Sequence, residues 1–125
     1  MLQALVLSIG SDVRVLNTRE LILRSAGHAV VSAISIREAA VLLKDSDFDV
    51  IVLCHTLLKK DCERFTGHLR ASGSLIPILY VSSTPSDEPS DFADATLDKN
   101  PDAFLMALQE VLRNHAHREL LDRET

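Results

Sequence analysis

Five short apolar runs, separated by longer segments of mixed polarity, organise this sequence. The most continuous run, Phe-Asp-Val-Ile-Val-Leu at residues 48–53, ends in four apolar residues without polar alternation. Such a run is typical of a strand that is buried on both faces, as in a parallel sheet covered by helices. Because ligands of these sheets bind just beyond the carboxyl ends of the strands, Cys54 stands where a site is expected.

The remaining apolar runs predict four more strands, at residues 4–8, 29–33, 76–81 and 95–97. The segments between them carry helix start and stop signals, namely polar caps, a glycine that ends a helix and a first-turn proline. These signals are Ser11 or Asp12 before a helix over residues 13–26, Gly27 after it, the capping box of Ser35 and Glu38 before a helix from Ile36, Asp61 before a third helix, and Asn100 with Pro101 before a fourth.

The alternation of strands and helices predicts one α/β domain over residues 1–125. The expected architecture is a flavodoxin-like, doubly wound parallel sheet of five strands in the order 2-1-3-4-5, with helices on both faces. Two prolines at residues 85 and 89 make a long helix between the last two strands improbable, so that helix should be reduced or missing. Residues 115–125 form either a helical extension or a frayed tail.

The composition of the chain argues against some classes of function. The chain has 125 residues, a formal net charge of −5 and only 4% aromatic residues, which argues against nucleic acid as a partner. No leader and no long apolar segment follow Met1, which predicts a cytoplasmic protein without a membrane partner. In that compartment Cys54 and Cys62 are expected to be free thiols.

In the predicted sheet the ends of the first, third, fourth and fifth strands converge. The residues gathered there are Gly10, Ser11 and Asp12, then Cys54 and His55, then Ser82, and finally Lys99.

The alternation of elements over the whole chain resembles the receiver domain of two-component response regulators. Ser82 follows the fourth strand and Lys99 the fifth, where that family has a hydroxyl and a lysine. The segments 16–21 and 26–28 are also similar to a receiver's first helix and the turn after it. The resemblance implies a stand-alone bacterial signalling module of the phosphorelay type, with a histidine kinase or a downstream signalling protein as its partner.

Two departures from the family pattern change what the resemblance implies. Receivers hold Mg²⁺ with an acidic pair after the first strand, and here Gly10 and Ser11 replace it with only Asp12 beside them. The aspartate that accepts the phosphoryl group is replaced by Cys54. Mg²⁺ needs several oxygen ligands and phosphoryl transfer needs a carboxylate nucleophile, so we expect no metal, no cofactor, no aspartyl phosphate and no enzymatic activity. The sequence therefore predicts a degenerate receiver that acts by protein–protein interaction.

Alternatives remain at the level of sequence. Cys54 is either a buried apolar residue or a redox thiol whose pKa Lys99 lowers and which pairs with Cys62 if it is exposed. A receiver that accepts phosphate on an unexpected residue is a further hypothesis. The pocket of Lys99, Ser82 and the first helix's amides could instead hold a small anion.

Three further features have two interpretations each. His55 is a loop residue or a general base. Arg19 falls within the apolar face of the first helix. Either its stem lies on apolar surface while its head reaches water or a carboxylate, or its guanidinium is a buried fork that fixes a partner or the active loop. The last helix either ends in solvent or pairs with a second copy through Leu112, Ala116, Leu120 and Leu121, giving a homodimer.

Overall fold

The structure is a computed structural model that describes residues 3–82, 93–97 and 100–124. For residues 97 and 116–124 it describes the backbone alone. Its five strands are all parallel and lie in the order β2-β1-β3-β4-β5, as the sequence predicts. The elements follow the chain as β1 (Leu5–Ile9), α1 (Val13–Ser25), β2 (Ala29–Ala33), α2 (Ile36–Asp45), β3 (Val50–Cys54), α3 (Lys59–Ala71), β4 (Ile78–Val81), β5 (Ala95–Leu97) and α4 (Pro101–Glu124).

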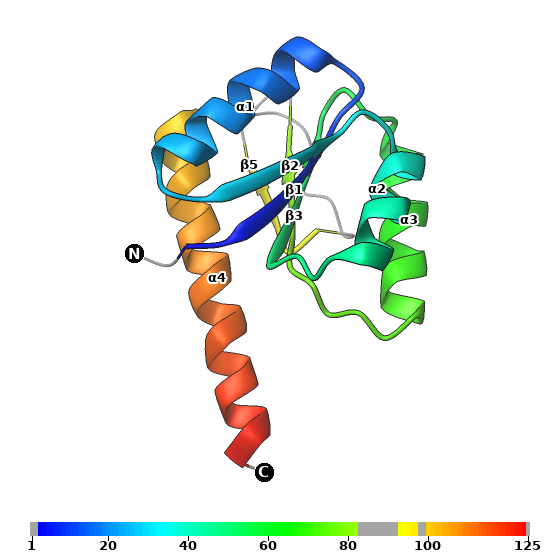
Figure 1. Cartoon of the computed structure of the whole chain (residues 1–125). Helices are drawn as coiled ribbons and strands as arrows, with labels where there is room; N and C mark the ends of the chain where they lie inside the picture. The colour runs from blue at the N-terminus through cyan, green and yellow to red at the C-terminus, as the bar shows by residue number, and fades with distance from the viewer. Residues whose placement is uncertain (1–2, 83–92, 98–99, 125) are drawn as a thin grey trace.

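Helices cover both faces of the sheet. Helices α1 and α4 lie on one face and α2 and α3 on the other (Figure 1). On the first face Leu23 of α1 and Phe104 and Leu108 of α4 share a core cluster with Val50 and Val52. On the second face Phe65 and Cys62 of α3 pack with Ile51 and Leu53. Every residue of β3 is buried, which is why its sequence lacks the polar alternation of a half-exposed strand.

Most of the predicted helix signals are confirmed. The Asp12 carboxylate accepts a hydrogen bond from the Arg14 amide at 2.9 Å, and the Ser35 hydroxyl accepts one from the Glu38 amide at 3.1 Å. The Asn100 side chain accepts from the Asp102 and Ala103 amides. Gly27 follows α1 with a φ of +93°, a left-handed conformation that glycine adopts without a steric penalty.

Several boundaries differ from the predicted ones, among them those of the third helix and the third strand. Helix α3 begins at Lys59, because the amides of Asp61 and Cys62 both donate to the Leu58 carbonyl, so Asp61 lies in the first turn and does not cap the helix. Strand β3 includes Cys54, which pairs with Val81 of β4, and so it ends one residue later than predicted. The expectation of a reduced helix between β4 and β5 concerns residues 83–92, which lie outside the described residues.

Helix α4 continues to Glu124, which supports the extension over the frayed tail. Its first half packs on the sheet, whereas its last turns project away from the body of the domain (Figure 1). With 24 residues the helix is about 36 Å long.

Candidate functional site

The site is centred on Cys54, at the carboxyl end of the central strand. The loop after β1 lies directly against it, because a Cβ atom built on Gly10 would be 3.0 Å from the Cys54 Cβ and 3.1 Å from the Thr56 Oγ1. The Gly10 amide donates to the Ala33 carbonyl of β2 at 3.1 Å, which holds this loop in place. The structure thus brings the predicted Gly10 and Cys54 together at the convergent strand ends.

Two hydrogen bonds join the loop after β1 to the loop after β3. The Ser11 amide donates to the Thr56 Oγ1 at 3.0 Å, and the Ser11 hydroxyl donates to the Thr56 carbonyl at 2.8 Å. Asp12, the single acidic residue left beside the first strand, is exposed and caps α1 through the Arg14 amide. These two loops are therefore tied to each other by protein groups.

Arg19 enters the site from α1. Its side chain is only 7% exposed, and its Nη1 donates a hydrogen bond to the Cys54 Sγ at 3.2 Å. The guanidinium carbon lies 5.7 Å from the centre of the Phe104 ring of α4, within the range of a cation–π interaction. Of the two interpretations of Arg19, the structure therefore shows the buried head with a fixed partner.

The guanidinium brings a permanent positive charge next to Cys54, because arginine is not deprotonated in proteins. Among the residues that the structure describes, no carboxylate forms an ion pair with Arg19. A divalent cation about 4 Å from this charge would be repelled by roughly 8 kcal/mol at an effective dielectric constant of about 20. The charge at this position therefore disfavours a cation.

The residues present do not fit the Mg²⁺ site of a receiver. Gly10 and Cys54 offer no carboxylate, and Mg²⁺ prefers octahedral oxygen ligation. The described part of the chain contains no group of three or more histidine, cysteine, aspartate or glutamate side chains suited to a metal ion. An anion is not favoured either at the start of α1, since the Ser11 and Arg14 amides already donate to Thr56 and Asp12.

The other predicted site residues are placed as follows. The His55 Nδ1 lies 3.7 Å from the Cys54 Sγ, and the His55 side chain is half-buried. Ser82 follows β4 and is 3% exposed. Lys99 lies outside the described residues, so its predicted effects on the Cys54 pKa and on an anion rest on the sequence alone.

Both cysteines are free and buried, Cys54 at 1% and Cys62 at 0% exposure. Burial, followed by the neighbouring Asp61 carboxylate, raises the pKa of the Cys62 thiol to about 12. A thiolate is the reactive form of cysteine, and a redox thiol must be reached by its oxidant. The condition on which the redox hypothesis depended, an exposed Cys54, is not met.

We expect both thiols of the native protein to react with a thiol-labelling reagent more than about a hundredfold more slowly than in denaturant, because labelling requires opening of the core. Mass spectrometry of the labelled wild type, with Cys54→Ser and Cys62→Ser variants to assign each adduct, measures this. Fast labelling of native Cys54 would instead support the redox hypothesis.

Two residues of the site were not singled out from the sequence. Thr56 is an ordinary loop residue until the fold sets it beside Ser11, and no sequence signal identifies it. Phe104 is one of several apolar residues of the last helix, and nothing in the local sequence separates it from the others. Its contact with Arg19 joins elements 85 positions apart in the sequence, which no local pattern can report.

Comparison with solved structures identifies the fold. The chain superposes on the chemotaxis response regulator CheY4 of Vibrio cholerae with a TM-score of 0.76 and 26% identity, over 88% of this chain and 99% of that one. The chain has a receiver-domain fold. The resemblance predicted from the sequence is therefore confirmed.

Two further structures share the receiver fold at lower identity. The receiver domain of the Francisella response regulator 1452 has a TM-score of 0.78 and 19% identity, over 90% of this chain and 98% of that one. The response regulator TrrA of Thermotoga maritima, solved in complex with Mg²⁺-BeF, has a TM-score of 0.72 and 16% identity, over 86% and 97%. No protein-family model and no curated protein matches the sequence.

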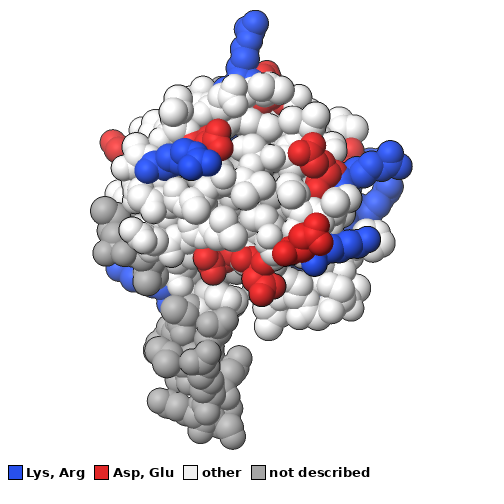
Figure 2. Space-filling view, in the orientation of Figure 1, with Lys and Arg blue, Asp and Glu red and all other residues white. Residues whose placement is uncertain are grey.

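The surface charges bear on the prediction that nucleic acid is not a partner, and the helices bear on the prediction that the protein has no membrane partner. On the face seen in Figure 2, basic side chains stand beside acidic ones and form no continuous basic patch among the described residues there. In the part of the chain that is described, no helix combines the length and the apolar character needed to span a bilayer.

Proposed function

We propose that this receiver-like domain is a cytoplasmic signalling module of a two-component or phosphorelay-type system that does not accept phosphate at the end of its third strand. It is a degenerate receiver that acts by binding a protein, either a histidine kinase or a downstream signalling protein. It catalyses no reaction of its own. Its conformation is then set by its partners.

One observation carries this proposal. The buried Arg19 guanidinium donates to the Cys54 sulfur, in the place where an active receiver needs a carboxylate nucleophile and a cation. Arg19 supplies a positive charge from within the chain, and Cys54 supplies no carboxylate. The Ser11–Thr56 hydrogen bonds support the proposal further, because they tie the two loops together around this point through groups of the chain itself.

The proposal includes a second copy of the chain as a partner. The last turns of α4 project from the body, and the sequence at positions 116, 120 and 121 is Ala, Leu and Leu. The prediction that Leu112 belongs to this dimer face is wrong, because Leu112 is buried in the core of its own chain. A helix that projects with apolar positions is stabilised when it packs against another helix. We therefore propose a homodimer through the last helix.

Incubation with a small phosphodonor and Mg²⁺, followed by intact mass measurement, tests the proposal. We expect no adduct of about 80 Da, the mass of one phosphoryl group, because the site has no carboxylate nucleophile. An active receiver treated in parallel shows that the donor works. A stable adduct of that mass would refute the proposal, and its position would be mapped with a Cys54→Ala variant.

A further inference from the structure

Helix α4 has an exposed seam on the side that faces away from the sheet. We define the outer seam by the described residues Ala103, Met106, Glu110 and Arg113, all of which are exposed. Their spacing of three, four and three residues places them along one face of the helix. Met106 is 72% exposed, the most exposed large apolar side chain among the described residues of the protein.

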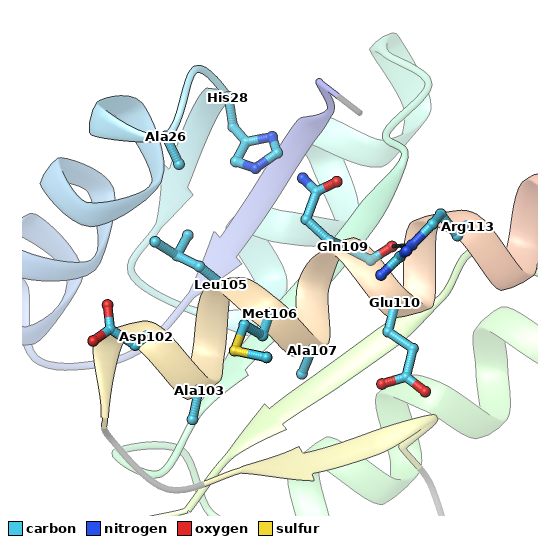
Figure 3. Close-up of a pocket in the computed structure, with 10 residues that line it drawn as sticks. All are labelled: Ala26, His28, Asp102, Ala103, Leu105, Met106, Ala107, Gln109, Glu110 and Arg113. Carbon is cyan, nitrogen blue, oxygen red and sulfur yellow. Dashed lines mark hydrogen bonds between the residues drawn. The ribbon is translucent and has the colours of Figure 1, made fainter. Parts of the chain in front are cut away.

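The seam borders an open hollow of about 870 Å³ that is lined by residues of α4 and of the turn after α1 (Figure 3). The small residues Ala103, Ala107 and Ala26 and the larger Met106 contribute to its lining. Figure 3 shows His28 opposite the side chains of Leu105 and Gln109. The hollow's small and apolar lining residues can contact an apolar side chain from another helix, and Asp102, Glu110 and Arg113 add charged groups to the same lining.

The same spacing continues into the projecting turns of α4. Steps of four, three and four residues from Arg113 lead to positions 117, 120 and 124. Position 120, a leucine, therefore falls on the line of the outer seam and not on the line of Phe104, Leu108 and Leu112, which pack on the sheet. Positions 117, 120 and 124 of the projecting end and the outer seam thus lie along one continuous side of the helix.

We infer that two copies of this chain associate through their outer seams, with the two α4 helices antiparallel about a two-fold axis, so that Glu110 of each copy faces Arg113 of the other. This inference rests on the homodimer included in the proposed function and adds its register. An axis midway between positions 110 and 113 also sets position 106 against 117 and position 103 against 120. Position 120 of one copy then lies beside position 103 of its partner.

Charge complementarity selects this register. Glu110 and Arg113 have opposite charges and lie three positions apart. A two-fold axis between them brings Glu110 of each copy beside Arg113 of the other, which gives two intermolecular ion pairs. A parallel pairing in register would place each charge against its own like charge, which is unfavourable. The antiparallel arrangement also lets each projecting end lie along the body of the other copy.

A charge-reversal series on the full chain tests the inference by sedimentation equilibrium. Glu110→Lys and Arg113→Glu each create like-charge contacts at two symmetry-related places, so each should weaken dimerisation at least about tenfold. The double variant E110K/R113E restores opposite charges and should recover the wild-type dissociation constant to within about threefold. Circular dichroism verifies folding, which is expected since both positions are exposed.

Glu63→Lys on α3 is the matched control, because it makes the same charge change at an exposed position on another face. It should leave dimerisation unchanged. A wild-type protein that stays monomeric at every concentration overturns both the inference and the homodimer in the proposed function. A dimer that ignores the reversals, or one that E63K weakens equally, overturns this register and leaves the homodimer standing.

Discussion

Replacing Arg19 by alanine is expected to lower the free energy of unfolding by about 2 kcal/mol, through loss of the cation–π contact and of buried packing. The arginine stem fills space between α1, Cys54 and the Phe104 ring, and the side chain is only 7% exposed. Part of the loss is offset, because alanine removes a charge whose burial is costly. Urea unfolding followed by circular dichroism gives the value.

Arg19→Met separates packing from charge. Methionine keeps much of the volume but removes the guanidinium, so we expect its stability to lie within about 1 kcal/mol of the wild type. Arg64→Ala on α3 is the control for loss of an exposed arginine and should stay within about 0.5 kcal/mol. If Arg19→Met is as damaging as Arg19→Ala, the charge and its hydrogen bond to Cys54 stabilise the fold, contrary to our expectation.

Gly10→Ala should also destabilise the protein by about 2 kcal/mol, for a purely steric reason. The added Cβ would lie 3.0 Å from the Cys54 Cβ, 3.1 Å from the Thr56 Oγ1 and 3.3 Å from the Leu16 Cδ2. The loop cannot easily retreat, because the Gly10 amide is bonded to Ala33 and the next residue to Thr56. Aspartate at this position would crowd Cys54 further, so one substitution does not return the acidic pair of a receiver.

The same chemical change at Gly67 has the opposite expected sign. Gly67 lies within α3, and a Cβ there meets nothing within 4 Å. Because alanine loses less backbone entropy in a helix, Gly67→Ala should stabilise the protein by about 0.5 to 1 kcal/mol. Thermal and urea unfolding of both variants provide the comparison. A Gly10→Ala variant as stable as the wild type would mean that the two loops move apart freely.

The elements of the fold were predictable because their signals are local. The apolar run of β3 needs only its own residues to indicate burial on both faces. Gly27, Ser35 and Asn100 act within a turn of the helix ends that they mark. The error at Asp61 has the same origin, because the local sequence is also compatible with a cap three residues earlier, at Leu58, whose carbonyl accepts the first hydrogen bonds of the helix.

The site was predictable only in part. Parallel topology places strand ends together, so the meeting of Gly10 with Cys54 followed from the predicted strand order. The roles of Thr56 and Phe104 did not follow, since they depend on side-chain directions across separate elements. For Arg19 the sequence showed an anomaly in an apolar face, and the structure showed where the guanidinium lies.

The sequence by itself determined the alternation of strands and helices and the sheet order, and its resemblance to receivers implied that Gly10, Ser11 and Cys54 stand where that family has carboxylates. Each of these depends on residue types and their spacing along the chain. Only the tertiary structure decided that Cys54 is sealed from solvent and that an arginine from α1 lies against it. Burial and contact are properties of several elements packed together, so no single segment of the chain contains them.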